Sequence, residues 1–309
     1  MVWLKAADEV TLRAAFWRVG ANAGTGAEMA ARGTVLLATG RSEFIEKYYP
    51  VIQGFLSLGF DVAAFDWRGQ GLSDRLIEDR LPGYVDSFDS YQRDLDTMLA
   101  EIDRRGMGER VVLVGHSMGG CAIIRRLSMP ERDFHAAILT APMLGLCFPT
   151  LAAPALRALS WSFSHWRVGK WRVSPSRVRT AADWPFEGNV LTSNPAEFKR
   201  YAALARTYPQ LALGGVTWAW LAAAFREMRS LRQLPHGAVD EPTLLFSAAD
   251  DRLVSNGAID DFAAKNPHVE HVRLSDSRHE PFVELEPVRA ELWREIGAFL
   301  DRVAPGAGV

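Results

Sequence analysis

A five-residue turn, Gly115-His116-Ser117-Met118-Gly119, constrains the fold of this chain more than any other part of its sequence. Four aliphatic residues, Val111 to Val114, precede the turn and predict a buried strand, and Gly119 to Leu127 behind it predicts a helix. A serine between a strand and a helix, with a glycine two residues away on each side, is the G-x-S-x-G pattern of a nucleophile elbow. The sharp turn exposes the hydroxyl, and the glycines leave no Cβ to clash where strand and helix crowd together. We therefore predict that Ser117 is a catalytic nucleophile.

Short apolar runs alternate with amphipathic segments on both sides of this turn. Such alternation is typical of an α/β fold, in which helices cover both faces of a mostly parallel sheet. The predicted strands span residues 10–16, 34–38, 61–65, 111–114, 136–139, 243–247 and 269–274. The predicted helices span residues 48–58, 90–105, 119–127, 256–265 and 283–303. A glycine-rich stretch at residues 21–33 precedes a strand and does not follow one, which argues against a nucleotide-binding loop there.

The segment between Met143 and Pro235 breaks this rhythm. Strand-like runs disappear, and helical stretches punctuated by prolines take their place. The strand–helix alternation then returns. We therefore predict one sheet domain, made of residues 1–143 and 236–309, with a helical cap inserted at residues 144–235.

A serine hydroxyl becomes a good nucleophile only beside a base, and in sheets of this type the chain order is serine, acid, histidine. Three histidines stand late in the sequence: His268, His271 and His279. His271 falls inside the predicted strand 269–274 and His268 directly before it, so a structural or surface role is the better interpretation of both. His279 falls in the loop after that strand, where site residues collect. We predict that His279 is the general base and then the general acid for the leaving group.

The acid that orients the histidine is expected after the strand at residues 243–247. Asp250 and Asp251 both stand there. Either could instead be a solvated turn residue, and the spacing alone does not choose between them. One of the two is expected to hold the imidazole tautomer and to stabilise the imidazolium.

A tetrahedral intermediate also needs two N–H donors for its oxyanion. One is the backbone amide of Met118, which follows the nucleophile at the start of a helix. The other is expected in the loop after the strand at residues 34–38, near Gly40 and Arg41. Removing one such donor typically costs about 3 kcal/mol of transition-state stabilisation.

Five further segments match the sequence blocks of one family, namely its His-Gly-x-Gly-Glu, G-x-x-V, D-x-R-G-x-G-x-S, A-P-M and D-R-x-V blocks. They are Thr39-Gly40-Arg41-Ser42-Glu43, Gly59-Phe60-Asp61, Asp66-Trp67-Arg68-Gly69-Gln70-Gly71-Leu72-Ser73, Ala141-Pro142-Met143 and Asp251-Arg252-Leu253-Val254. With the elbow and His279, they make the chain similar to the α/β-hydrolases and, more narrowly, to the lysophospholipase and monoacylglycerol lipase group of serine hydrolases. The resemblance extends from about Thr34 to Leu300. Thr39 stands where the family usually has a histidine, and Ser42 stands where it has the second glycine. These two departures leave the geometry of that loop open.

The resemblance implies an α/β-hydrolase fold with a cap and a triad of Ser117, His279 and Asp251, so it selects Asp251 over Asp250. It implies Arg41 as the second oxyanion donor, and neither a metal nor a cofactor. The implied activity is that of a serine carboxylic-ester hydrolase, acting through an acyl-enzyme on a lipid-like ester with one acyl chain, such as a lysophospholipid or monoacylglycerol. A peptidase or amidase, a lactone or carbon–carbon bond hydrolase, and a non-enzymatic binding protein stay open as alternatives.

The predicted cap differs from the rest of the chain in charge and in tryptophan content. Residues 144–235 hold 12 basic and 4 acidic residues, so the cap carries +8 and the remainder −10 of the net charge of −2. Six of the ten tryptophans lie in the cap. A solvated basic face is the favoured interpretation of the charges, and a lid that contacts anionic lipid is the alternative. Aromatic residues of a cap are expected to line the pocket it covers. The predicted pocket residues are Gly40, His116, Trp218, Trp220, Leu221 and Phe225.

Composition excludes several other classes of protein. A net charge of −2 excludes a globally basic nucleic-acid binder, and no apolar run reaches the roughly 18 residues of a membrane span. Cys121 and Cys147 make neither a disulfide framework nor a zinc site. The first ten residues lack the apolar stretch of a signal peptide, so we expect a cytoplasmic protein with at most peripheral membrane contact. The expected partner is a small-molecule or lipid ester substrate.

Overall fold

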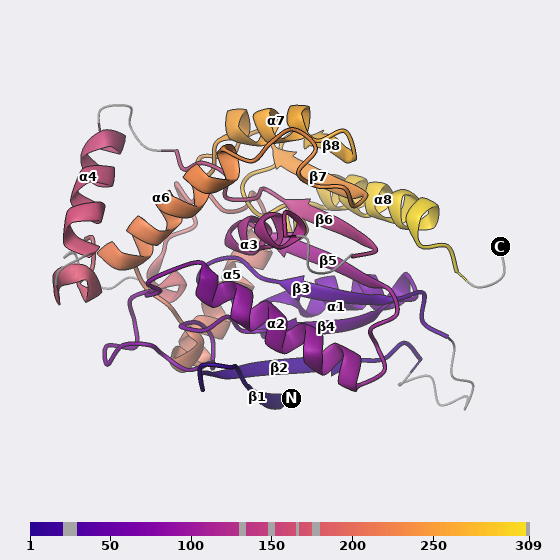
Figure 1. Cartoon of the computed structure of the whole chain (residues 1–309), viewed down its shortest axis with the longest axis horizontal. Coiled ribbons are helices and arrows are strands. Elements are labelled where there is room, and N and C mark those ends of the chain that lie inside the picture. Colours follow the sequence, from indigo (N-terminus) through magenta and orange to yellow (C-terminus); the bar gives the residue numbers. More distant parts are fainter. Residues whose placement is uncertain (21–29, 130–133, 148–151, 165–166, 175–179, 307–309) are drawn as a thin grey trace.

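The computed structural model describes residues 1–20, 30–129, 134–147, 152–164, 167–174 and 180–306. In this part of the chain an eight-stranded sheet carries helices on both faces (Figure 1). The strands are β1 (Val2–Lys5), β2 (Thr11–Trp17), β3 (Thr34–Ala38), β4 (Asp61–Phe65), β5 (Val111–His116), β6 (Ala136–Thr140), β7 (Thr243–Ala248) and β8 (Val269–Leu274). The flanking helices are α1 (Tyr49–Ser57), α2 (Asp89–Arg104), α3 (Met118–Leu127), α7 (Asn256–Lys265) and α8 (Glu286–Val303). Most of the glycine-rich stretch at residues 21–33 lies outside the described residues.

The strand order β1-β2-β4-β3-β5-β6-β7-β8 confirms the predicted α/β fold. The strands from β4 to β8 in this order run parallel, and β1 and β2 join one edge antiparallel. Parallel strands end at the same edge of a sheet, so the loops after β3, β5, β7 and β8 meet there. The sequence did not predict β1, because this strand has only four residues and none of them is fully buried.

The sheet is buried on both faces because alternate side chains of a strand point in opposite directions. In β3, Leu36 packs into the apolar layer that contains α2, α3 and α7, whereas Val35 and Leu37 pack into the layer that contains α1 and α8. Figure 1 shows α2 and α3 in front of the sheet and α1 behind it. Each fully buried side chain of this size contributes about 1.5–3 kcal/mol to the stability of the fold. This packing holds both helix layers against the sheet.

The helix ends differ slightly from the predicted ones. Helix α8 begins at Glu286 and not at Val283, because Pro281–Val283 forms a separate 3₁₀ turn and Pro287 occupies the first turn of α8. Helix α3 begins at Met118, directly after Ser117. No helix in the described part of the chain combines the length and the apolar character needed to cross a bilayer.

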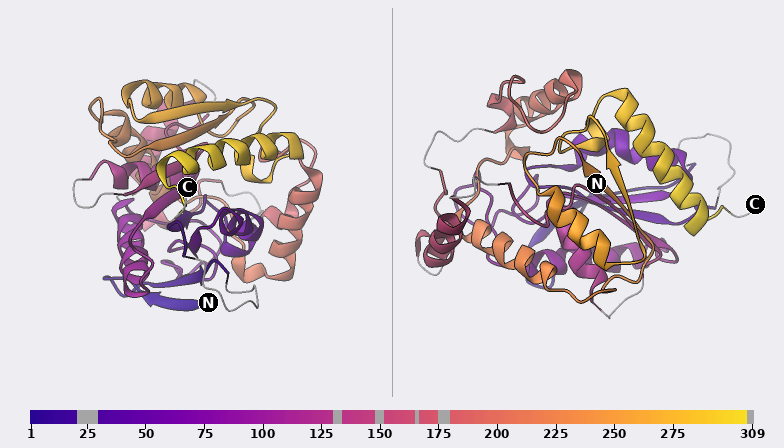
Figure 2. Two further views of the ribbon diagram at one scale, coloured as in Figure 1. Left: turned by 90° about the vertical axis from the view of Figure 1, so that its right-hand side faces the viewer. Right: turned by 90° about the horizontal axis from the view of Figure 1, so that it is seen from above.

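Among the described residues between β6 and β7, within the segment for which we propose a cap, lie the three α-helices α4 (Ala152–Ser164), α5 (Pro195–Thr207) and α6 (Trp218–Arg232). Helix α4 packs against α6, and α5 lies apart from this pair in the view from above (Figure 2, right). Asn194 caps the start of α5 and Thr217 the start of α6, each accepting backbone N–H bonds on its side-chain oxygen.

The loop between β4 and α2 forms backbone hydrogen bonds with the segment before α6. Gly214 donates its N–H to the Leu81 carbonyl at 2.7 Å, and Gly83 donates to Gly215 at 2.9 Å. Thr217 donates in turn to the Gly83 carbonyl at 3.0 Å. These bonds hold the start of α6 beside the sheet domain.

Candidate active site

Ser117 lies between β5 and α3 with φ +51° and ψ −112°. A left-handed φ costs a residue with a side chain about 1–2 kcal/mol, so tight packing must maintain it. A Cβ on Gly119 would lie 2.1 Å from the Ala38 carbonyl oxygen, and one on Gly115 would lie 2.8 Å from the Gly120 backbone. Both glycines of the elbow are therefore required by the close approach of β3, β5 and α3.

His279 connects Ser117 to Asp251. Its Nε2 lies 2.9 Å from Ser117 Oγ, and its Nδ1 lies 2.7 Å from Asp251 Oδ2. An ionised carboxylate only accepts hydrogen bonds, so Nδ1 carries the proton and Nε2 is left to accept the serine proton. The side chains of His279 and Asp251 are 5% and 0% exposed, which shields both contacts from water.

The acid beside the histidine is Asp251, whereas Asp250 is exposed to solvent. Asp251 Oδ1 also accepts the backbone N–H groups of Leu253 at 2.8 Å and Val254 at 3.0 Å. Burial alone would raise the pKa of Asp251, but the hydrogen bond and charge of His279 and these two N–H donors lower it. Asp251 is therefore ionised at neutral pH.

The other two late histidines lie away from the nucleophile. His271 is in β8, where its Nε2 lies 2.8 Å from Ser247 Oγ. His268 precedes β8, and its carbonyl accepts the N–H of Thr243. Both take the structural positions that the sequence suggested.

Side chains on both sides hold the loop after β3. Glu43 accepts the N–H of Gly40, and Gln70 donates to the Gly40 carbonyl at 3.1 Å and accepts the Ser42 N–H at 3.0 Å. The Arg41 amide between these anchors has no acceptor in the described part of the chain. The Met118 amide is in the first turn of α3, where N–H groups have no partner within the helix. Both amides are thus available to an oxyanion.

The two departures from the family sequence leave this loop intact. Ser42 stands where the second glycine is usual and takes the glycine-like φ of +66°. The hydroxyl of Tyr201 donates to the Ser42 carbonyl at 2.6 Å, which helps to hold the strained residue. Thr39, which replaces the usual histidine, accepts the Trp67 indole N–H on its carbonyl at 2.8 Å.

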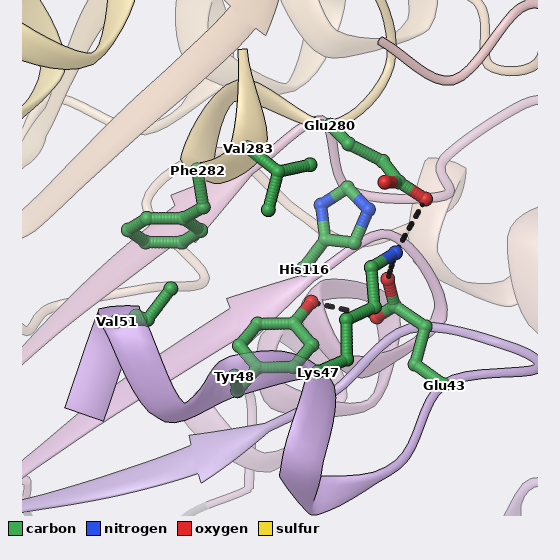
Figure 3. Close-up of a pocket in the computed structure, with 8 residues that line it drawn as sticks. All are labelled: Glu43, Lys47, Tyr48, Val51, His116, Glu280, Phe282 and Val283. Carbon is green, nitrogen blue, oxygen red and sulfur yellow. Dashed lines mark hydrogen bonds and ion pairs between the residues drawn. The ribbon is translucent and has the colours of Figure 1, made fainter. Parts of the chain in front are cut away.

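Behind the loop lies a buried cluster of charged side chains (Figure 3). Lys47 Nζ lies 2.6 Å from Glu43 Oε1 and 2.7 Å from Glu280 Oε1, and Tyr48 donates its hydroxyl to Glu43 at 2.6 Å. Burial opposes ionisation of Glu43, but its contact with Lys47 lowers its pKa to about 2. Burial raises the pKa of Glu280. The cluster thereby fixes Glu43, which in turn fixes the Gly40 amide.

His116 lies at the edge of the same cluster, beside His279. Its ring centroid is 4.9 Å from that of His279, and its Nδ1 lies 3.0 Å from Thr140 Oγ1. Burial lowers the pKa of His116 to about 4, so the ring is neutral. The ligand atoms of His116, Glu43 and Glu280 lie within 4.8 Å of one another. However, the Lys47 ammonium already binds both carboxylates, so this group does not suit a divalent cation.

A cavity of about 300 Å³ lies between Ser117 and the proposed cap. The predicted residues Gly40, His116, Trp220 and Leu221 line it, together with Arg41, Ser117 and His279. Its other apolar and aromatic wall residues are Met143, Leu146, Trp184, Leu191, Tyr201, Val216, Leu253 and Val254. The cavity is therefore polar at the nucleophile and largely apolar elsewhere, as a site for an acyl chain would be.

Two of the predicted pocket residues lie outside this cavity. Trp218 packs edge-on against Phe163 of α4, with ring centroids 5.0 Å apart. Two residues along a helix turn the side chain by about 200°, so Trp218 and Trp220 face opposite sides of α6. Phe225 lies one turn beyond Leu221 and lines a second groove, between α4 and α6. The prediction was wrong for both because it did not place the helix axis relative to the nucleophile.

Sequence reasoning missed the residues that support the loop after β3. Glu43 and Gln70 stood inside recognised blocks, and Glu280 stood next to His279, but no spacing indicated that their side chains converge. The sequence pointed to Arg41 only as a backbone donor, although its guanidinium lies over the ring of Trp220, a residue that lines the cavity.

A family model described as serine aminopeptidase, S33 (Hydrolase_4), matches residues 29–286. The chain is 30% identical over 279 residues to lysophospholipase L2 of Escherichia coli, an alignment that covers 87% of this chain and 80% of that protein. It is 24% identical over 275 residues to the probable lysophospholipase L2 of Haemophilus influenzae, covering 89% and 85% of the two chains.

The fold is similar to that of a solved lipase. A soluble variant of monoglyceride lipase from Saccharomyces cerevisiae superposes with a TM-score of 0.75 at 18% identity, covering 98% of this chain and 97% of the lipase. At this identity the likeness concerns the fold alone.

Proposed function

Because the chain belongs to the Hydrolase_4 family of α/β-hydrolases, described as serine aminopeptidase, S33, we propose that it hydrolyses a lipid-like carboxylic ester with one acyl chain, such as a lysophospholipid or a monoacylglycerol. One observation carries the proposal. Ser117, His279 and Asp251 form a continuous hydrogen-bonded chain at the polar end of a mainly apolar cavity of about 300 Å³. The similarity to lysophospholipase L2 supports the choice of a lipid ester.

The proposed reaction has two halves, joined by an acyl-enzyme. In the first half Ser117 Oγ attacks the ester carbonyl carbon while His279 Nε2 takes the serine proton, and the carbonyl oxygen becomes an oxyanion. The amides of Met118 and Arg41 bind that oxyanion. The imidazolium of His279, stabilised by Asp251, then donates its proton to the leaving alcohol as the ester C–O bond breaks.

In the second half water takes the place of the alcohol. His279 removes a proton from the water, the resulting hydroxide attacks the acyl carbon, and a second oxyanion forms in the same position. Its collapse breaks the bond to Ser117 Oγ and releases a fatty acid, and His279 returns the proton to Ser117. Atoms and protons balance with water as the only co-reactant.

We further propose that residues 144–235 act as a cap that contacts lipid surfaces. Trp161 and Trp171 are 64% and 67% exposed, and exposed tryptophans favour a membrane interface. A groove beside Trp161 is lined by four arginines with no carboxylate partner among the described residues: Arg157, Arg226, Arg229 and Arg232. Exposed cations of this kind attract anionic headgroups.

The family description names a second candidate, an aminopeptidase. Recognition of a free α-amine requires an unpaired carboxylate near the nucleophile. Of the described residues that line the cavity, the two carboxylates, Glu43 and Glu280, are both bonded to Lys47, and the cation without a carboxylate partner is Arg41. The charges of the site therefore favour the ester hydrolase.

The proposal is tested with Ser117→Ala and a substrate panel of lysophospholipids, monoacylglycerols, short soluble esters and aminoacyl amides. We expect hydrolysis of single-chain esters that rises above the micelle threshold and disappears in Ser117→Ala, with unchanged folding by circular dichroism. Ser57→Ala, an exposed serine at the end of α1, is the matched control and should keep full activity. Ester hydrolysis that persists in Ser117→Ala, or selective hydrolysis of aminoacyl amides, would contradict the proposal.

A further inference from the structure

One wall of the cavity contains a cation that the proposed reaction does not use. Arg41 lines the cavity together with Ser117 and Trp220, and its guanidinium lies over the Trp220 ring. Its Nη2 donates to the carbonyl of Gly214, just before α6, and its Cζ lies 5.3 Å from the centroid of the Trp220 ring. A carbonyl and an aromatic face thus hold the guanidinium in a fixed place.

No carboxylate neutralises this guanidinium. Arg41 forms no ion pair within the described ranges, and its Nε is buried without any acceptor. The ionisable groups whose charges act on this guanidinium are the phenols of Tyr91 and Tyr201. Both phenols already have hydrogen bonds, since Tyr91 accepts the Trp220 indole N–H and Tyr201 donates to Ser42. Burial lowers the pKa of Arg41 to about 10, which leaves it charged at neutral pH.

An unpaired cation inside a protein is unfavourable, because its lost hydration is not replaced by an opposite charge. A ligand anion in the cavity would replace that hydration. A guanidinium binds phosphate oxygens through charge-assisted, often paired hydrogen bonds, and one N–H of Arg41 is accounted for by Gly214. The cavity therefore has the chemistry of a phosphate subsite a short distance from the nucleophile.

We infer that the Arg41 side chain binds a phosphate group on the alcohol part of the substrate, and so makes phosphate-bearing single-chain esters better substrates than neutral monoacylglycerols. The inference rests on the proposed ester hydrolysis at Ser117. The same residue would then bind the substrate twice, with its amide at the ester oxygen and its side chain at the phosphate. A glycerol unit that separates ester from phosphate is similar in length to an arginine side chain, so one substrate can reach both groups.

The test compares a lysophospholipid with a monoacylglycerol of the same acyl chain, both below their micelle thresholds, on wild type, Arg41→Gln and Arg75→Gln. The measured quantity is the ratio of the two kcat/KM values on each protein, so a general disturbance of the oxyanion loop cancels. We expect the ratio to fall about 10- to 100-fold in Arg41→Gln, the usual loss when a hydrogen bond to a charged group is removed. Arg75 is the matched control, because its guanidinium bonds carbonyls of Ser73, Arg80 and Gln210 and does not line the cavity.

Inorganic phosphate is the second probe. It should inhibit monoacylglycerol hydrolysis by wild type competitively, and inhibit Arg41→Gln at least 10-fold more weakly. An unchanged substrate ratio in Arg41→Gln, with both esters still cleaved, would overturn the inference and leave the proposed function standing. Competition by phosphate without any advantage of the lysophospholipid on wild type would assign the subsite to free phosphate and also overturn it. If wild type cleaves neither ester, the proposed function itself fails.

Discussion

Two cations stand near the loop after β3, the buried Lys47 and the half-buried Arg41, and they differ in their partners of opposite charge. Lys47, behind the loop, contacts two carboxylates, Glu43 and Glu280, at 2.6 and 2.7 Å. Arg41, in the loop itself, has a carbonyl and an aromatic ring as neighbours and no carboxylate. A paired buried cation builds structure, whereas an unpaired one leaves a charge for a ligand to neutralise. This difference supports the proposed binding role of Arg41, whereas Lys47 supports the loop.

The same contrast between paired and unpaired charges separates the sheet side of the site from the proposed cap. On the side of the sheet domain, every charged group of the triad and of the cluster behind the loop has a partner of opposite charge or a hydrogen-bond donor. In the proposed cap, four exposed arginines gather on one groove with no carboxylate partner in the described residues. Catalysis requires fixed charges, and recognition of anionic lipid requires free ones.

The largest expected effect comes from removing the contact between Asp251 and His279. Asp251→Asn should lower kcat by about 10⁴-fold, because the amide cannot hold the imidazole tautomer that accepts the Ser117 proton. Asp250→Asn removes the neighbouring carboxylate, which is exposed and does not contact His279, and should change kcat by less than about 2-fold. Steady-state kinetics on a soluble ester measures both. Equal losses in the two variants would mean that Asp251 does not orient the histidine.

The comparison of the two cations is tested directly by removing each. Lys47→Met leaves two buried carboxylates without their partner and should lower the free energy of unfolding by about 3–5 kcal/mol. Arg41→Met removes an unpaired charge from a half-buried position and should leave stability unchanged or raise it. Urea unfolding of the two variants beside wild type measures this difference. A loss of similar size in Arg41→Met would show that the guanidinium has a structural partner after all.

The pH dependence of stability tests whether His116, beside the paired cluster, is neutral in the folded protein. Burial holds the pKa of His116 at about 4, against an ordinary value of 6.5. The unfolded chain therefore takes up this proton first, and the stability that neutral His116 contributes is present above pH 6.5 and is lost as the pH falls towards 4. Between pH 7 and pH 5 the loss should be about 2 kcal/mol. His116→Gln should lose about that much less over the same interval, and parallel pH curves for the two proteins would argue against a neutral buried His116.

The sequence predicted the sheet and the elbow well because both depend on local patterns. The strands predicted at residues 34–38 and 61–65 coincide with β3 and β4, since a fully buried parallel strand is apolar along nearly all of its length. The choice between Asp250 and Asp251 needed the family resemblance. Adjacent residues of a turn point in different directions, and spacing along the chain does not say which one faces His279.

The cluster behind the loop and the true cavity wall could not be predicted in this way. Glu43, Lys47 and Glu280 meet only because the loop after β3 and the turn before α8 lie side by side in the folded sheet. Trp218 and Trp220 are the same residue type in the same helix, so the sequence does not distinguish them. The orientation of α6 in the fold decides that Trp220 lines the cavity and that Trp218 packs against α4. The unpaired state of Arg41 is likewise a property of its neighbours, which lie far away in the sequence.

The smallest expected effect concerns the free charges of the cap. Arg229→Gln removes one exposed arginine of the groove, and it should weaken binding to vesicles that contain anionic lipid about 5-fold, because one basic residue near such a surface contributes about 1 kcal/mol. Arg294→Gln changes the net charge equally but lies on α8, beside Glu295, and should leave binding unchanged. Sedimentation with vesicles of zwitterionic lipid, to which neither variant should bind differently from wild type, separates charge attraction from insertion of Trp161 and Trp171. If Arg229→Gln and Arg294→Gln weaken binding equally, the attraction depends on overall charge, and the cap arginines are a solvated face as the sequence first suggested.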